Sequence, residues 1–270
     1  MSSVSGSAAN PLISVRGLTK SFGSKAVLRG IDLDVAPGQV LGYIGPNGAG
    51  KTTTVKILTG MLDPFDGQAA VCGFDIRREP LEVKRRIGYV PESAALYDAL
   101  TPREYLGFIG QLYGLAEEEI QRRTTEMLGL FGLAAELDQR MATFSKGMRQ
   151  KVLIVAGLIH NPQVLFLDEP LSGLDANSVV IVKEVITRLA QHGKAIFYCS
   201  HVMDVVERIC DRIIILADGH IIADGTFEQL QTMNKAASLE RIFTQLTSAG
   251  GQVAVADRFV ETLERPAGHG

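Results

Sequence analysis

The chain has 270 residues, of which 46% are hydrophobic, and its 27 lysines and arginines nearly balance its 30 aspartates and glutamates. This length allows one large or two small globular domains with a sizeable core, and a formal net charge of −3 without a basic block disfavours nucleic acid as the main partner. The three cysteines show no CxxC spacing, and no apolar run approaches the roughly 18 residues of a membrane-spanning helix. We therefore expect a reduced, cytoplasmic chain that does not itself cross a membrane.

The first predicted elements are a polar tail and a group of strands. Residues 1–10 are small and polar, and we expect them to be disordered, like the closing RPAGHG (265–270) of the C-terminal tail at 248–270. Strand-like runs follow at 13–18, 27–35 and 40–44 with no helical segment between them. This order predicts an N-terminal antiparallel β subdomain.

From residue 40 onward, strands and helices alternate. The run at 40–44 precedes a glycine-rich loop and a helix from Thr52, and three further strands are predicted at 164–167, 195–199 and 213–216. Helices are expected from about Ala176 and from Val202, between these strands. Such alternation predicts an α/β core with a parallel sheet.

Two segments lie outside this alternation. Residues 93–144 contain no convincing strand and are rich in helix formers, so we predict a helical insertion into the α/β core. Near the end, SLERIFTQLTS is typical of a short amphipathic helix.

The glycine-rich loop GPNGAGKTT matches G-x-x-x-x-G-K-[ST] and stands between a strand and a helix, as a phosphate-binding loop requires. Its glycines let backbone N–H groups approach an anion, Lys51 brings a cation to the β and γ phosphates, and the Thr52 hydroxyl is a ligand for Mg²⁺. The alternative is a glycine-rich turn that binds nothing. The predicted nucleotide-binding residues here are Gly45, Pro46, Asn47, Gly48, Ala49, Gly50, Lys51, Thr52 and Thr53.

The run VLFLDEP supplies carboxylates to the same site. Four apolar residues predict a buried parallel strand, so Asp168 and Glu169 follow at the strand end where ligands of open α/β sheets bind. We predict that Asp168 holds Mg²⁺ through water and that Glu169 orients and deprotonates the attacking water. The alternative is a pair of exposed acids without a ligand. The two motifs together predict a P-loop ATPase or GTPase.

In chain order, GPNGAGKTT, FSKGMRQ, FLDEP, SGLD and CSH resemble the nucleotide-binding subunit of ATP-binding-cassette (ABC) transporters. The resemblance covers roughly residues 12–247 and implies an ABC nucleotide-binding domain over 11–247, with ATP and Mg²⁺ as its ligands. It implies an α/β P-loop ATPase core with a parallel sheet, an N-terminal antiparallel subdomain and a helical insertion.

The resemblance also assigns roles to three isolated residues. Phe22 falls at the aromatic position where a ring stacks on adenine; the alternative is a core phenylalanine of an early strand. Asp175 resembles the loop aspartate that links two nucleotide sites across a dimer. His201 resembles the switch histidine that contacts the γ-phosphate, against the alternative of a structural histidine.

FSKGMRQ stands where the family has its LSGGQ signature, with Lys146 and Met148 in place of glycine and glutamine. Ser145 and Gly147, which can approach an anion closely, remain. In the family, two subunits pack head to tail and this helix start points at the γ-phosphate bound by the partner's loop. The alternative is an ordinary helix start capped by Ser145.

A second departure is Glu92, in IGYVPES, where the family usually has glutamine. A carboxylate can bind Mg²⁺ or a water, but it repels the γ-phosphate more than an amide does. The GYVPE run is similar to a subset of exporter subunits.

The resemblance thus implies the ATP-hydrolysing motor of a membrane exporter. Its partners are expected to be separate transmembrane permease subunits and a second copy of the ATPase subunit, at the cytoplasmic face of the membrane. The alternatives are a soluble ABC ATPase that acts on ribosomes or DNA, and a P-loop kinase or GTPase.

Overall fold

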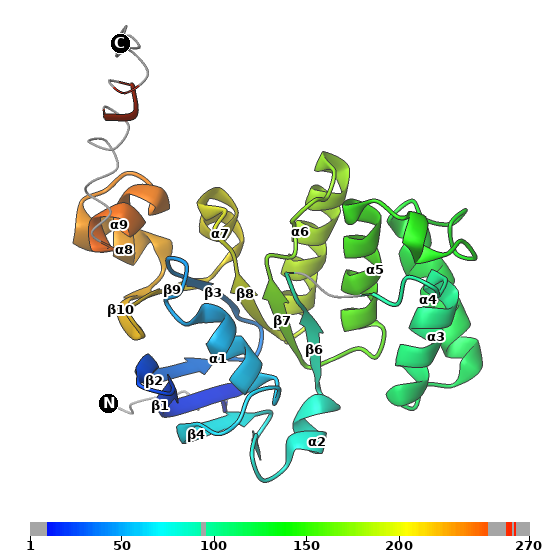
Figure 1. Ribbon diagram of the computed structural model, residues 1–270, viewed down its shortest axis with the longest axis horizontal. Coiled ribbons are helices and arrows are strands. Elements are labelled where there is room, and N and C mark those ends of the chain that lie inside the picture. Colours follow the sequence, from blue (N-terminus) through cyan, green and yellow to red (C-terminus); the bar gives the residue numbers. More distant parts are fainter. Residues whose placement is uncertain (1–9, 93–95, 248–257, 261, 263–270) are drawn as a thin grey trace, which may run out of the picture.

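The computed structural model describes residues 10–92, 96–247, 258–260 and 262, which form two β-sheets and the helices around them (Figure 1). Most of the two predicted tails therefore lies outside the described residues. Of residues 1–10 only Asn10 is described, and of residues 248–270 only 258–260 and 262 are described. No described helix combines the length and the apolarity that a bilayer crossing demands.

The smaller sheet is antiparallel and has the strand order β2-β1-β4-β5. The prediction of an antiparallel N-terminal subdomain is confirmed for its first two strands, although β1 runs four residues beyond the predicted end, to Phe22. The sheet comprises β1 (Ile13–Phe22), β2 (Lys25–Val35), β4 (Asp66–Val71) and β5 (Phe74–Asp75).

The larger sheet has the order β10-β9-β3-β8-β7-β6, and all its pairings are parallel except that of β10 with β9. The expected parallel sheet is thus confirmed, while β6 and β10 were not predicted. Its strands are β3 (Val40–Ile44), β6 (Ile87–Val90), β7 (Val164–Asp168), β8 (Ala195–Cys199), β9 (Arg212–Ala217) and β10 (His220–Gly225).

The position of β3 corrects one expectation. The prediction that residues 40–44 join the antiparallel group is wrong, because β3 pairs in parallel with β8 and β9. Parallel neighbours require long crossover connections, and those of β3 lie more than a hundred residues away along the chain. The glycine-rich loop consequently leaves the carboxyl edge of the parallel sheet.

The helices predicted from Thr52, Ala176 and Val202 begin within a residue of those positions, as α1, α6 and α7, whereas α2 and α8 were not predicted. The described part of the predicted insertion, 96–144, contains α3, α4 and the 3₁₀ helix η1 and no strand, as expected, and α9 corresponds to SLERIFTQLTS. The helices are α1 (Lys51–Leu58), α2 (Pro80–Lys84), α3 (Pro102–Leu112), α4 (Glu117–Leu130), η1 (Met141–Thr143), α5 (Lys146–Leu158), α6 (Ala176–Gln191), α7 (Met203–Ile209), α8 (Phe227–Asn234) and α9 (Leu239–Leu246).

Two hydrophobic clusters hold these layers together. One lies between the two sheets and includes α1, whose Val55, Ile57 and Leu58 are fully buried (Figure 1). The other joins the opposite face of the larger sheet to α5, α6, α7, the helical segment 96–144 and the C-terminal helices. Burial on both faces makes the central strands continuously apolar and fixes the carboxyl ends of β3, β7 and β8 along one edge.

Candidate functional site

The phosphate loop, residues 45–53, connects β3 to α1 in a conformation that only glycine tolerates at two points. Gly50 has φ 113°, and a Cβ there would lie 2.5 Å from Leu28 Cδ2. A Cβ on Gly45 would lie 2.3 Å from the carbonyl oxygen of Leu216. The backbone therefore curls tightly before α1, whose first N–H groups have no intrahelical acceptor and are available to an anion at the loop.

Lys51 lies across this loop. Its Nζ donates to the carbonyl oxygens of Gly45, at 2.6 Å, and of Pro46, at 3.1 Å. The ammonium group is thus held at the start of the loop. A cation in this place adds charge attraction to an anion-binding backbone.

Asp168 ends β7 and is 5% exposed, so its carboxyl group is buried at the sheet edge. Burial, followed by the nearby carboxylates of Glu92 and Glu169, raises the pKa of Asp168 to about 6, while Lys51 and the Thr52 hydroxyl act in the opposite direction. The structure therefore brings together the predicted magnesium ligands, Asp168 and Thr52, with Lys51 and Glu92. Oxygen donors of this kind suit Mg²⁺.

Glu169 takes an unusual backbone conformation at the turn that follows β7. Its φ is 49°, and its N–H donates to the carbonyl oxygen of Cys199 at the end of β8. The carboxylate accepts hydrogen bonds from Ser200 Oγ at 2.9 Å, from the backbone N–H of His201 at 2.8 Å, and from His201 Nδ1 at 2.7 Å. A strained residue held by several partners is a common feature of reactive sites.

Ser200 was not assigned a role from the sequence, although it lies in the CSH segment. It is 2% exposed, and its hydroxyl donates to Glu169 and accepts from the backbone N–H of Val202. In the sequence, only its position directly before His201 could have indicated a role for Ser200. A serine hydroxyl can reach a carboxylate from many positions, so no characteristic spacing identifies it.

Phe22 stands at the end of β1 with 49% of its surface exposed, so the alternative of a core phenylalanine is wrong. Lys20 Nζ lies over the ring, 4.9 Å from its centroid. An exposed aromatic ring near the hairpin that leads into β2 is available for stacking.

Lys25 is a further residue that the sequence did not single out. With Val27 it lines a pocket of about 290 Å³ whose other walls include Lys51, Thr52 and Thr53. Two lysines and no acid among its lining residues favour an anionic ligand. Lys25 could not be predicted from the sequence, because a single lysine at the start of a strand belongs to no motif.

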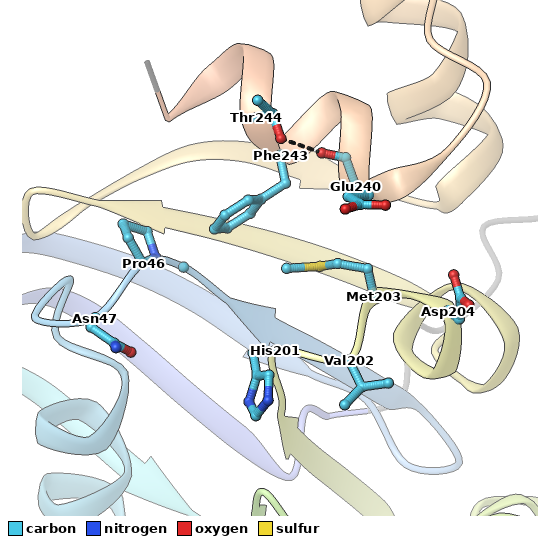
Figure 2. Close-up of a pocket in the computed structure, with 10 residues that line it drawn as sticks. Pro46, Asn47, His201, Val202, Met203, Asp204, Glu240, Phe243 and Thr244 are labelled. Carbon is cyan, nitrogen blue, oxygen red and sulfur yellow. Dashed lines mark hydrogen bonds between the residues drawn. The ribbon is translucent and has the colours of Figure 1, made fainter. Parts of the chain in front are cut away.

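A larger pocket, of about 500 Å³, adjoins the phosphate loop on the side of α9 (Figure 2). Pro46 and Asn47 come from the loop, His201 and Met203 from the segment after β8, and Phe243 from α9. The C-terminal helix therefore forms part of the surroundings of the loop and the histidine.

The segment FSKGMRQ starts α5, and Ser145 is its N-cap, accepting from the backbone N–H of Met148 at 3.3 Å. Lys146 Nζ donates to Ser172 Oγ at 2.7 Å, and a Cβ on Gly147 would lie 2.5 Å from the carbonyl oxygen of Gly173. Among the described residues, those lining the pockets around the phosphate loop include none of residues 145–147. The structure of one chain does not bring this segment into the loop site.

Asp175 has partners within its own chain. It caps α6 by accepting from the N–H and Oγ of Ser178, at 2.9 and 2.7 Å, and it pairs with Lys151 Nζ at 2.9 Å. These hydrogen bonds, with that cation, hold the pKa of Asp175 well below its usual range. Lys151, on α5, was not predicted.

Comparisons with known proteins agree with this geometry. The family model described as "ABC transporter" matches residues 28–172. The chain is 40% identical over 220 residues to the ABC transporter ATP-binding protein NatA of Bacillus subtilis (strain 168), covering 81% of this chain and 89% of that protein. It is 35% identical over 247 residues to the daunorubicin resistance ATP-binding protein DrrA3 of Streptomyces coeruleorubidus, covering 92% and 78%.

Solved structures extend the agreement to the fold. One, described as the structure of an ATP-binding subunit of an ABC transporter, superposes with a TM-score of 0.83 at 34% identity, over 87% of this chain and 99% of that one. The relatives favour a transporter subunit over an ATPase of ribosomes or DNA. The chain belongs to the ABC transporter family, as an ATP-binding subunit that hydrolyses ATP and works with transmembrane partners.

Proposed function

We propose that this protein is the ATPase motor of a membrane exporter and that residues 11–247 form its nucleotide-binding domain. Export is supported by relatives named for resistance to daunorubicin and, in the 38% identical protein LnrL of Bacillus subtilis (strain 168), to linearmycin. We place the subunit at the cytoplasmic face of the membrane, where it is held by its permease.

In the nucleotide site, we assign the triphosphate to residues 45–53, with Lys51 at the β and γ phosphates. Thr52 and Asp168 are the ligands we propose for Mg²⁺, which would neutralise charge between those phosphates. The fit is chemical, since a buried carboxylate beside a hydroxyl offers hard oxygen donors. Glu92 completes the acidic side of this site.

The proposed reaction is the attack of water on the γ-phosphorus of ATP, which breaks the bond to the bridging β-phosphate oxygen and releases ADP and phosphate. Glu169 orients the water and removes its proton, because an ionised carboxylate accepts a hydrogen bond from water and then the proton. His201 is oriented by the same carboxylate and would contact the γ-phosphate region through Nε2. The contact that supports these roles is the short hydrogen bond between Glu169 and His201.

We further propose that the complete site forms between two copies packed head to tail. The observation that carries this step is that Ser145, Lys146 and Gly147 are absent from the loop pockets of their own chain, within the residues described. The start of α5 would then bind the γ-phosphate held by a partner, and Asp175 would lie near the partner's loop.

A mixed-dimer experiment tests this arrangement. Ser145→Asp keeps an N-cap of equal quality but adds a carboxylate that repels phosphate, and Ser145→Asn is the neutral matched control. We expect Ser145→Asp and Lys51→Ala each to be inactive alone. Random mixing of the two should restore roughly a quarter of the wild-type ATPase activity, because about half the dimers are mixed and each has one intact site.

A second readout covers the case in which turnover needs both sites. With Glu169→Gln added to both chains, mixed dimers should retain labelled ATP in the one intact site. Mixed dimers that form but neither hydrolyse nor retain ATP would show that the α5 start acts within its own chain. If Ser145→Asn is also inactive, the inactivity of Ser145→Asp would be explained by a folding defect and not by repulsion between its carboxylate and the phosphate.

The transporter assignment is tested by affinity purification from detergent-solubilised membranes of cells that express the tagged chain. We expect a polytopic membrane protein to co-purify. Ribosomal proteins or DNA in its place would favour the alternative of a soluble ABC ATPase.

A further inference from the structure

Lys20 is a buried cation on the strand that carries Phe22. It is 7% exposed, although lysine is among the residue types least often buried. The two residues are separated by one position on β1, so their side chains leave the same face of the strand. The pairing of β1 with β2 shifts in register between Lys20 and Ser21, and the contact of the ammonium group with the ring shows that the two side chains lie together.

The ammonium group of Lys20 has two partners. Its Nζ donates to the carbonyl oxygen of Pro64 at 2.5 Å and lies 4.9 Å from the centroid of the Phe22 ring. Within the described chain, Lys20 forms no ion pair with a carboxylate. Because a buried charge is costly unless it is paired, the carbonyl and the ring together stabilise this cation.

The Phe22 ring has one face beneath the Lys20 ammonium group and remains partly exposed to solvent. With the ammonium over one face, half of the Phe22 surface remains exposed, and this surface is available to a planar ligand. A cation beneath an aromatic ring draws electron density toward itself, which reduces the repulsion between the other face and the π-system of a second ring. The anchored cation also restricts the ring before a ligand arrives, so less conformational entropy is lost on stacking.

We infer that Lys20 is a positioning residue for the nucleobase, acting through Phe22 and anchored by Pro64. The inference rests on the proposed role of Phe22 in binding adenine. Lys20 does not contact the base; it fixes the orientation and polarisation of the ring on which the base stacks.

A double-mutant cycle tests this coupling. ATP affinity is measured by titration calorimetry for the wild type, Lys20→Met, Phe22→Ala and the double variant. Methionine keeps an unbranched apolar chain and removes the charge. We expect Lys20→Met to weaken ATP binding about fivefold, as loss of a cation–π contact at a half-exposed ring implies, and to add nothing once Phe22 is alanine.

Two further measurements distinguish positioning from general support of the fold. Inorganic tripolyphosphate, which has no base, should bind all four proteins equally. In ATPase assays, Lys20→Met should raise KM and leave kcat unchanged, because the base contact is the same in ground state and transition state. Lys84→Met, at an exposed lysine on α2 without an ion pair among the described residues, is the matched control and should behave as the wild type.

The possible results distinguish the positioning role of Lys20 from the binding of the base by Phe22. If Phe22→Ala weakens ATP binding but Lys20→Met does not, or weakens it equally in both backgrounds, the positioning role is refuted while the base site stands. Equal losses of ATP and tripolyphosphate affinity would also refute it. If Phe22→Ala binds ATP as the wild type does, the base site itself is refuted.

Discussion

Glu169 Oε1 accepts hydrogen bonds from both the backbone N–H and the Nδ1 of His201, at 2.8 and 2.7 Å. The two residues follow neighbouring parallel strands, β7 and β8, which are in register up to the pair Asp168 and Cys199. Because one oxygen receives both donors, the orientation of the imidazole and that of the carboxylate depend on each other. Four testable predictions concern this pair, the loop cation Lys51, the buried Lys151 and the pH dependence of stability at His160.

The first concerns the proposed base. Glu169→Gln should bind ATP with wild-type affinity and lower turnover by roughly 10² or more, the usual range for loss of a general base, since an amide cannot take a proton from water. The measurement is single-turnover hydrolysis together with size-exclusion chromatography, in which we expect an ATP-bound dimer. Ser200→Ala removes one donor and retains the carboxylate, so its effect should be much smaller. Full hydrolysis by Glu169→Gln would transfer the role to another group, and His201 would be tested next.

The second concerns the loop cation. Lys51→Ala should abolish ATP hydrolysis and weaken nucleotide binding, because the β and γ phosphates lose a charge-assisted donor. Titration with ATP and ADP, alongside phosphate-release assays, measures both effects. Turnover like that of the wild type in this variant would contradict the assignment of the phosphate loop.

The third concerns a cation outside the site. Lys151 is largely buried on α5, where its Nζ pairs with Asp175 and donates to the carbonyl oxygen of Phe131 at 3.2 Å. Lys151→Met should lower the urea midpoint of unfolding by a small but measurable amount, because it removes the ion pair to Asp175 and the hydrogen bond to Phe131. The effect is small because Asp175 is half exposed and water screens its charge. Urea unfolding measures this change, and Lys151→Arg should retain most of the stability. An unchanged urea midpoint in Lys151→Met would show that the pair contributes nothing.

The fourth is a dependence of stability on pH. His160 Nε2 contacts the carbonyl oxygen of Ile87 at 2.8 Å, and its ring stacks on Tyr113 with centroids 3.6 Å apart. Burial, opposed by the Ile87 hydrogen bond, lowers the pKa of His160 from its ordinary value of 6.5, so the unfolded chain binds this proton more readily than the folded one. The contribution of His160 to folding is therefore lost as the pH falls below about 6.5 toward the lowered pKa, and is constant above it.

His160→Gln removes the titrating group, and its amide can still donate to Ile87. Urea midpoints at pH 7.5 and 5.5 should fall less between these two values in His160→Gln than in the wild type. An equal fall in both proteins would mean that His160 is not responsible for acid sensitivity.

Local patterns predicted the parts of the molecule that short segments determine. GPNGAGKTT and VLFLDEP specify strand ends, a tight loop and paired acids within nine residues or fewer, and the structure forms them there. The roles of Phe22 and His201 came from the family resemblance, because a lone aromatic or histidine has no spacing to identify it.

Features that depend on distant partners could not be predicted. The parallel pairing of β3 is set by β8 and β9, which follow much later in the chain. The contacts of Lys20 with Pro64 and of Lys151 with Asp175 likewise join residues on separate elements. Short strands such as β6 carry too few residues for a period to emerge.

Residues 170–175, which follow Glu169, contact α5 through three side-chain interactions. Gln150 Nε2 donates to the carbonyl oxygen of Pro170 at 3.1 Å, Lys146 bonds Ser172, and Lys151 pairs with Asp175. Because these three contacts span residues 170–175, a displacement at the start of α5 would also displace the segment next to Glu169. In the proposed head-to-tail pair, phosphate held by one copy would then act on the Glu169 segment of the other, so that the nucleotide in one site would influence both sites.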